Sequence, residues 1–253
     1  METIDLSIVT IAYQNFEELK ETLETIDSQT IKPQENNLIL SGFNDKEKEA
    51  ILKKYSRSYR NFYWDLDSSL FNAMNVGIDK SNSYFILFLN AGDTFYSNYC
   101  LEVAKTNLHE DICYSFKTLQ VFENISILRE NIPQKGLLGL GRETNLPPHQ
   151  GFIAPNKKEI YFNENLRVSA DNEWMGRNMS KYGIFFSDKI IANFKLGGQS
   201  TYPTLKIIYI KLKYEKFLRF VIECLKYSYS LFVSKKLYFV TMAKLRKYRI
   251  IEK

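Results

Sequence analysis

A short segment of the chain joins an apolar run directly to a carboxylate. Residues 85–89 are entirely apolar, as is typical of a strand buried in a sheet, and Asn90, Gly92 and Asp93 follow at once. The carboxylate has two interpretations. It is either the N-cap of a helix that begins near Thr94, or a ligand for Mg²⁺ or Mn²⁺, which prefer oxygen. Gly92 would let a bulky diphosphate approach the backbone.

Two later segments also carry residues that could do chemistry. Asp171 opens a predicted helix, where the helix dipole favours the ionised carboxylate, so it is either a general base or a simple cap. His149 follows Pro147-Pro148, which force an extended approach, and its role is either structural or functional. The other histidine, His109, lies in a polar stretch and is interpreted as a solvated surface residue.

Alternating strands and helices must position the first of these segments. Apolar patterns predict strands over residues 4–11, 37–40, 62–65 and 84–89 and helices over 16–26, 46–55 and 69–80. Asn15 and Glu18 predict a capping box at the first helix. The alternation indicates a mostly parallel sheet with right-handed crossovers. Ligands bind beyond the carboxyl ends of such strands, so residues 12–13, 41–42 and 90–93 should meet at one rim.

The pattern is less regular after residue 100. Strands are predicted over 111–122 and 150–154, a helix over 171–182 and a hairpin-like pair of strands around Ser187-Asp188. The segment 196–200 contains two glycines and is either a lid over bound phosphates or an ordinary turn.

Length and composition set limits on the class of protein. The 253 residues are 45% hydrophobic, enough for one α/β domain of ordinary size. Cys100, Cys113 and Cys224 show no paired spacing and are expected to be reduced, intracellular thiols. The first residues are acidic and strand-like, so no secretory signal is expected.

The charge is unevenly distributed along the chain. Residues 204–253 carry 13 basic and 3 acidic side chains, a net charge of +10, whereas the chain as a whole is at +5. Apolar residues are interleaved with these cations, but no run reaches the roughly 18 uncharged residues of a membrane span. The pattern predicts interfacial helices on an anionic membrane surface; the alternative is a helical cap packed on the main domain. No motif supports nucleic-acid binding.

In order and spacing, six segments of the chain resemble the inverting family 2 glycosyltransferases with the GT-A fold. The resemblance extends from about residue 6 to residue 200. The segments are residues 7–30, 67–78, 88–93, 149–152, 168–174 and 196–200.

The resemblance implies a nucleotide-diphosphate sugar bound across the rims of the first four strands. Residues 88–93, FLNAGD, are similar to a variant of the family's aspartate-rich motif, in which Asp93 would hold Mn²⁺ or Mg²⁺. Asn90 replaces the usual first aspartate and would contact the nucleotide sugar. Asp171 matches the catalytic base, although Ala170 replaces the acid before it. The other positions implied around the donor are Ala12, Tyr13, Ser41, Asp67, Asn75 beside Met74, Ala91 and His149.

Two departures from the family pattern affect the expected specificity. Ser41 stands where relatives usually have the aspartate that recognises uracil; Asp45 or the Ser41 hydroxyl could replace it. No QxxRW-type segment, as processive relatives carry, follows Asp171. Single addition of a sugar is therefore expected.

The sequence thus predicts an α/β protein of GT-A fold: a Rossmann-like, mostly parallel sheet flanked by helices, with a basic amphipathic helical extension. Residues 1–100 would bind the nucleotide sugar, 101–203 the acceptor, and 204–253 would form the extension. The activity that the resemblance implies is metal-dependent transfer of a hexosyl or N-acetylhexosaminyl group from a nucleotide-diphosphate sugar, with a UDP-sugar as the expected donor, to a lipid-linked saccharide. It would serve capsule, O-antigen or exopolysaccharide synthesis at the inner face of the cytoplasmic membrane.

Two alternatives remain open. A nucleotidyltransferase would also bind a nucleotide at the rim of a sheet. It should show a Gly- and Lys/Arg-rich signature after the first strand, which residues 12–15 lack. A non-catalytic scaffold subunit of a membrane polysaccharide-assembly complex is favoured by the changes at Ser41, Asn90 and Ala170. Asp93 and Asp171 argue against the scaffold.

Overall fold

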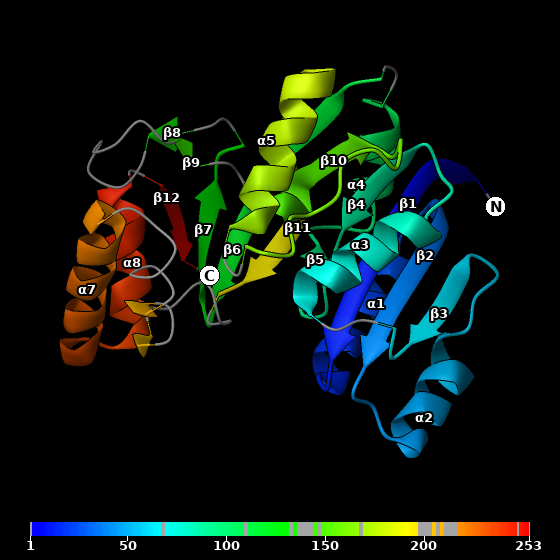
Figure 1. Cartoon of the computed structure of the whole chain (residues 1–253), viewed down its shortest axis with the longest axis horizontal. Coiled ribbons are helices and arrows are strands. Elements are labelled where there is room, and N and C mark those ends of the chain that lie inside the picture. Colours follow the sequence, from blue (N-terminus) through cyan, green and yellow to red (C-terminus); the bar gives the residue numbers. More distant parts are fainter. Residues whose placement is uncertain are drawn as a thin grey trace.

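The computed structural model describes residues 2–66, 69–108, 111–131, 134–135, 144–145, 148–166, 169–196, 204–205, 208–209, 217–246 and 248–252. In this part of the chain, ten strands form one mixed sheet with helices on both faces (Figure 1). The strand order is β12-β7-β6-β10-β4-β1-β2-β3, and β11 pairs with β5 and β6.

The first half of the chain follows the predicted alternation of strands and helices. Its elements are β1 (Thr3–Tyr13), α1 (Phe16–Asp27), β2 (Lys32–Ser41), α2 (Asp45–Tyr55), β3 (Arg60–Trp64), α3 (Leu70–Lys80) and β4 (Phe85–Phe88). β1 runs parallel to both β2 and β4, and β2 runs parallel to β3. The carboxyl ends of these four strands therefore lie at one edge, as the sequence predicts.

The second half adds antiparallel strands to this sheet. Its elements are β5 (Thr94–Phe95), α4 (Cys100–Lys105), β6 (Cys113–Phe122), β7 (Ile125–Arg129), the short pair β8 (Gln134–Lys135) and β9 (Thr144–Asn145), the 3-10 helix η2 (His149–Gly151), β10 (Phe152–Pro155), α5 (Ala170–Tyr182) and β11 (Ile184–Lys195). β10 lies between β4 and β6 and is antiparallel to both, so it joins the two halves.

Two local predictions are wrong. The predicted hairpin around Ser187-Asp188 is part of one strand, β11, which runs parallel to β6 and shifts register between Phe186 and Ile190. The chain bends there through a bulge and does not reverse. The predicted capping box at α1 does not form either, because the Asn15 side chain donates to the Glu18 carboxylate and accepts no helix N–H.

Helices cover both faces of the sheet and enclose two cores. On one face, α1 and α4 contribute the buried residues Leu19, Leu23, Ile26, Cys100, Leu101 and Ala104. On the other face, α3 and α5 contribute Ala73, Met74, Ile78, Ala170, Trp174 and Met175. Trp174 anchors α5: its ring stacks on Phe162 at 4.7 Å between centroids, and its Nε1 donates to Ile160 O at 3.0 Å.

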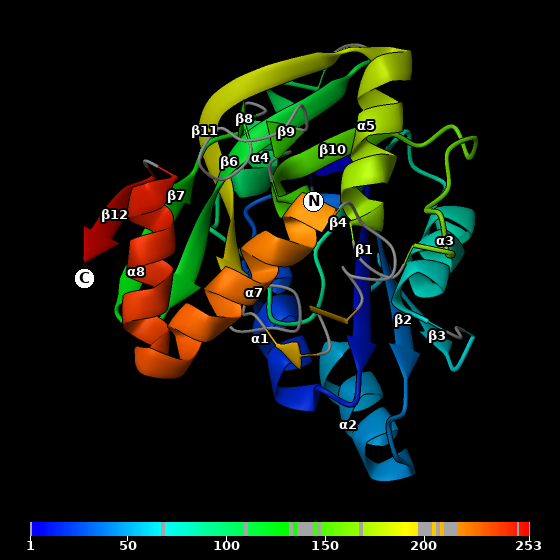
Figure 2. The ribbon, with the colours of Figure 1, turned by 60° about the vertical axis from the view of Figure 1, so that its left-hand side comes forward.

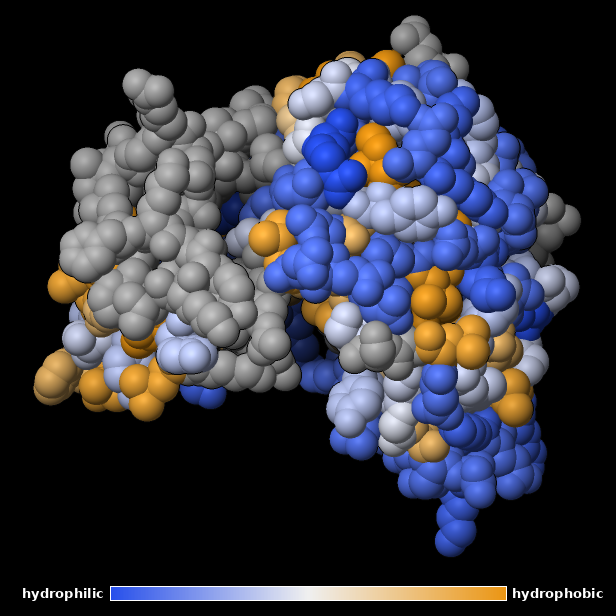
Figure 3. Space-filling model, viewed as in Figure 1, coloured by the Kyte–Doolittle hydropathy of each residue, from blue (hydrophilic) through white to orange (hydrophobic). Residues whose placement is uncertain are grey.

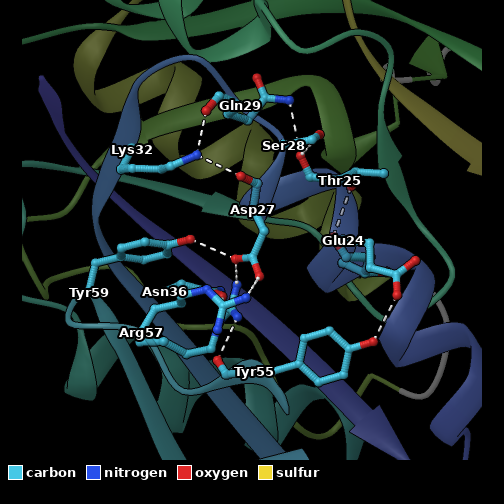
Figure 4. Close-up of polar contacts among 12 residues, drawn as sticks. Glu24, Thr25, Asp27, Ser28, Gln29, Lys32, Asn36, Tyr55, Arg57 and Tyr59 are labelled. Atoms are coloured by element: carbon cyan, nitrogen blue, oxygen red, sulfur yellow. Dashed lines mark hydrogen bonds and ion pairs between the residues drawn. The ribbon is translucent and has the colours of Figure 1, made fainter. Parts of the chain in front are cut away.

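Hydrogen bonds and ion pairs connect the end of α1 to the start of β3 (Figure 4). Asp27, the last residue of α1, accepts from Tyr59 and from both Arg57 and Arg60 at 2.7–2.9 Å. The Arg60 side chain is fully buried, so Asp27 supplies the negative charge that it requires.

The C-terminal segment is partly integrated into the sheet. It contains α7 (Phe217–Phe232), α8 (Lys235–Leu245) and β12 (Arg249–Glu252), and β12 pairs antiparallel with β7. Figure 2 shows α8 beside these strands, and Tyr238, Phe239 and Ala243 of α8 share a core with Ile125 and Ile127 of β7. Among the described helices, none is long and apolar enough to cross a membrane.

One end of the α7–α8 pair exposes apolar side chains. Leu231, Phe232 and Leu237 lie at the turn between the two helices and are 63%, 85% and 48% exposed. Apolar surface is visible at this end of the pair (Figure 3). The described part of the basic segment thus packs as a cap on the sheet and still presents an apolar tip.

Candidate active site

The turn after β4 holds Asp93 in a fixed, buried position. The Asp93 N–H donates to Asn90 O at 2.9 Å, and the Thr22 hydroxyl of α1 donates to Asp93 O at 2.7 Å. The Gly92 N–H donates to the same hydroxyl, and Gly92 has a φ of +94°, which favours glycine. Thr94 begins β5, so Asp93 does not cap a helix and that interpretation is wrong.

The Asp93 carboxylate is almost completely removed from solvent. It is 5% exposed, and Gln150 Nε2 donates to its Oδ2 at 3.0 Å. Burial raises the pKa of Asp93 to about 6, although His149 and the hydrogen bond from Gln150 act in the opposite direction. The carboxylate is therefore only moderately acidic when no cation is bound.

His149 links the two sides of the site. Its Nε2 lies 3.4 Å from Asn90 Nδ2, after β4, and its Nδ1 lies 3.5 Å from Asp171 Oδ2, at the start of α5. His149 belongs to η2, which packs tightly on β6. A Cβ at Gly151 would lie 2.4 Å from a carbonyl oxygen of β6, so only glycine allows this approach.

Asp171 is the second residue of α5. The N-cap position belongs to Ser169, so the interpretation of Asp171 as the N-cap is wrong. Burial raises the pKa of Asp171, but the hydrogen bond and charge of His149, together with backbone N–H donors, outweigh burial and lower the pKa. The side chain is 32% exposed, so this ionised carboxylate remains accessible to a substrate.

The oxygen atoms around Asp93 fit a hard divalent cation. Asn90 Oδ1 and Gln150 Oε1 are buried and accept no hydrogen bond from any described residue. Within the described residues, no three His, Cys, Asp or Glu side chains converge on one point. A site for Mg²⁺ or Mn²⁺ does not need three, because these ions commonly bind one or two carboxylates together with substrate phosphates and water.

The predicted rim residues after β1, β2 and β4 come together. Tyr13 pairs with Ser41 in the register of β1 and β2, and Ala12 pairs with Leu40. The Ala91 N–H donates to the carbonyl of Ile11, next to Ala12, at 3.0 Å. Ala12 is buried, whereas Tyr13 is 65% exposed and available to a ligand.

Other predicted residues lie elsewhere or are not described. The Asn75 side chain forms hydrogen bonds with the segment before α5: it donates to Phe162 O at 3.0 Å and accepts from Phe162 N at 2.7 Å. Met74 is in the core. A donor contact for Asn75 stays a prediction. Asp67, His109 and the glycines of residues 197–200 lie outside the described residues.

The structure adds two residues that sequence analysis missed. Gln150 reaches Asp93, and its position next to His149 was the only signal for it. Asp65 follows β3 with a φ of +52° and accepts from the Gly42 N–H at 3.1 Å and from Lys48 at 2.9 Å. It therefore places a carboxylate beside the end of β2, where Ser41 replaces the usual aspartate.

Comparison with solved structures identifies glycosyltransferases with the same fold. No family model matches the sequence, and no curated protein matches it. The chain is similar to S. aureus TarS 1–349 in complex with UDP-GlcNAc, with a TM-score of 0.60 and 16% identity over 89% of this chain and 67% of that chain. For the UDP complex of TarS 1–349 the TM-score is 0.59 at 16% identity, over 78% of this chain and 61% of that chain.

A third similar structure is the mannosyltransferase PcManGT from Pyrobaculum calidifontis in complex with GDP-Man and Mn²⁺. The TM-score is 0.53 at 11% identity, over 78% of this chain and 58% of that chain. The chain thus spans about three fifths of the length of the UDP-bound TarS fragment and of PcManGT. These similarities confirm the GT-A fold at identities far too low to identify a substrate.

Proposed function

We propose that this protein is an inverting, metal-dependent glycosyltransferase that uses a UDP-sugar as donor and a lipid-linked saccharide as acceptor. One observation carries the proposal: Asp93, His149 and Asp171 converge at the carboxyl end of the sheet. In the similar structures, TarS is bound to UDP or UDP-GlcNAc, and PcManGT to GDP-Man and Mn²⁺.

The donor would lie across the rim formed by Tyr13, Ser41 and the turn at residues 90–93. Asp93, with the free amide oxygens of Asn90 and Gln150, would hold Mn²⁺ or Mg²⁺. When bound, such an ion stabilises the negative charge that develops on the departing nucleoside diphosphate. Burial of Asp93 excludes water from this part of the site.

Asp171 would act as the general base. It takes the proton of the acceptor hydroxyl while that oxygen bonds to the anomeric carbon and the bond from this carbon to the diphosphate breaks. Displacement from the face opposite the leaving group inverts the anomeric configuration. His149 holds the Asp171 carboxylate in its ionised form, as the lowered pKa indicates.

The nucleobase would be recognised by residues at the carboxyl ends of β2 and β3. Asp65 supplies a carboxylate next to Gly42, which supports recognition of a uracil N–H despite Ser41. Lys48 pairs with the same carboxylate and keeps it ionised, since it lowers the pKa of Asp65 together with the Gly42 N–H.

A role in surface-polysaccharide assembly, with peripheral attachment to the inner face of the cytoplasmic membrane, is part of the proposal. Two features support it: the net charge of +10 over residues 204–253 and the apolar tip at Leu231, Phe232 and Leu237. Basic segments with an apolar face bind anionic membrane surfaces.

Calorimetric titration of the full chain with UDP, GDP and dTDP, each with and without Mn²⁺, tests the donor site. We expect UDP to bind only with Mn²⁺, and Asp93→Asn to abolish this binding. Asp188→Asn, a change at a side chain that is 79% exposed, is the matched control and should bind as the unmodified chain does. If GDP bound and UDP did not, the proposed recognition of uracil would be wrong. If none of the three nucleotides bound, the non-catalytic scaffold function would be favoured. Titration with UDP-glucose and UDP-GlcNAc then separates hexosyl from N-acetylhexosaminyl transfer.

A further inference from the structure

A buried arginine lies at the end of β7, and none of the described carboxylates pairs with it. The Arg129 side chain is 7% exposed, and its guanidinium lies over the Tyr248 ring, 4.4 Å from the centroid. Its Nη1 donates to the Tyr248 hydroxyl, whereas its Nε is buried and has no hydrogen-bond partner. The partner that the structure gives Arg129 is thus a phenol and not a carboxylate.

A second arginine, Arg246, lies two residues before Tyr248 in the chain. Arg246 directly follows α8, is half-buried, and also has a buried Nε without a hydrogen-bond partner. Burial lowers the pKa of Arg129 to about 10; the Tyr248 phenol acts in the opposite direction, and the positive charge of Arg246 lowers the pKa further. No carboxylate in the described part of the chain contributes. Among the described residues, neither arginine forms an ion pair. The two guanidinium groups therefore repel each other in an environment that is poor in water.

Such an arrangement is unfavourable unless an anion completes it. Buried charges in folded proteins are normally paired, because removing a charge from water is costly. Guanidinium groups match phosphate oxygens well, since their planar N–H donors form bidentate, charge-assisted hydrogen bonds. A phosphate placed between Arg129 and Arg246 would use both free Nε–H donors and remove the repulsion.

The arginine pair is separate from the candidate catalytic residues. Arg129 pairs with Thr118 in the register of β6 and β7. The methyl group of Thr118 lies against Gly151, two residues after His149. One strand, β6, therefore lies between the two groups of residues. The basic C-terminal segment around Arg246 would attract anions to this side of the molecule.

We propose that Arg129, Arg246 and the Tyr248 hydroxyl form a second binding site, for a phosphate or diphosphate group. The group could belong to a free anion or to a phosphorylated lipid, which present the same oxygens to the two arginines. The site does not depend on the proposed transferase activity, because none of its residues belongs to the donor rim.

Calorimetric titration of the full chain with inorganic pyrophosphate in EDTA tests this site. EDTA prevents binding through a metal at Asp93, and Asp93→Asn should bind pyrophosphate as tightly as the unmodified chain. Arg246→Met and Arg129→Met should each weaken binding about tenfold or more, as expected for the loss of a charge-assisted hydrogen bond. Arg249→Met, which removes an exposed arginine of the same segment, is the matched control and should change the affinity less than about threefold.

The variants also separate a binding role from a structural role. Because Arg129 is buried, Arg246→Met, a change at a half-buried side chain, carries the test if Arg129→Met does not fold. Without pyrophosphate, Arg246→Met should melt at the same temperature as the unmodified chain or higher, and it should lose the stabilisation that pyrophosphate gives. Absence of binding to the unmodified chain would overturn the proposal. An equal loss of pyrophosphate affinity in Arg246→Met and Arg249→Met would also overturn it. Binding would then reflect only diffuse attraction of the anion to the basic segment.

Titration with farnesyl diphosphate distinguishes the two sources of the phosphate. Affinity at least tenfold higher than for pyrophosphate, and lost in Arg246→Met, would identify a phosphorylated lipid. Equal affinity for both, again lost in Arg246→Met, would identify a free anion. Binding of both probes that is unchanged in Arg246→Met would show that the arginine pair is not an anion site.

Discussion

Replacement of Asp93 by asparagine should stabilise the metal-free protein above neutral pH. Burial raises the pKa of Asp93 from its ordinary 3.8 to about 6, so in this range the folded chain retains a proton that the unfolded chain has lost. The free energy of unfolding therefore falls as the pH rises through this range, and the loss is complete above about pH 7. At about 1.36 kcal/mol per pH unit, the loss amounts to about 3 kcal/mol. Asparagine carries no charge, so the Asp93→Asn variant does not lose this free energy of unfolding.

Thermal unfolding in EDTA at pH 4, 6 and 8 measures this effect. Asparagine has the shape of aspartate, and its amide oxygen can still accept from Gln150. The variant should melt roughly 6–12 °C above the unmodified chain at pH 8, since each kcal/mol corresponds to about 2–4 °C in a domain of this size. At pH 4 the variant and the unmodified chain should have the same melting temperature. Asp188→Asn, at an exposed position, should show no such dependence on pH.

Addition of Mn²⁺ and UDP should reverse the order of stability. Ligands that bind only the folded state stabilise it, by about 4.1 kcal/mol at a concentration of 1,000 Kd, and only the chain with Asp93 should gain this. A variant that is less stable than the unmodified chain at pH 8 without ligands would refute the reasoning. So would a difference that persists at pH 4, because it could not arise from ionisation of Asp93.

Three further predictions test other parts of the structure. Asp171→Asn should lower the rate of sugar transfer by roughly 10²–10⁴ and leave UDP affinity unchanged, because it removes only the general base; normal transfer would contradict the assignment. Asp27→Ala should cost about 3 kcal/mol or more in urea unfolding, because it leaves the buried Arg60 unpaired, whereas Arg57→Ala, at a 40% exposed side chain, should cost less than about 1 kcal/mol. Gly151→Ala should lower the melting temperature and transfer together, since its Cβ would meet the main chain of β6; an unchanged melting temperature would show that η2 can shift at no cost.

The first half of the fold was predictable because its signals are local. The apolar run of β1 and the helical spacing of Leu19, Leu23 and Ile26 are visible within single segments, and each element forms where its pattern indicates. Ser187-Asp188 resembles a turn by the same local criteria. Whether the chain turns at this point depends instead on pairing with β6, about 70 residues earlier in the chain. This pairing keeps β11 continuous through Ser187-Asp188.

The site was only partly predictable, for the same reason. Asp93 and Asp171 stand out as carboxylates at the start or end of predicted elements, and the family resemblance gives each a role. The link between them through His149 depends on contacts across 59 residues to Asn90 and across the loop to Asp171. No sequence pattern reports such contacts, so those of His149 are visible only in the structure, and its role stays a prediction.

Asp93 and Arg129 share a property that hydropathy cannot predict. Each is a charged group that is less than a tenth exposed, and each has a pKa displaced in the direction that weakens its charge. Structural charges such as Arg60 are also buried, but Arg60 has Asp27 at 2.9 Å. Among the described residues, the Asp93 carboxylate has amide donors from Gln150 and Asn90 and no ion pair, and Arg129 has a phenol and a second arginine. The missing counter-charge distinguishes a binding site from a structural ion pair: a cation would complete the first site, and a phosphate group the second.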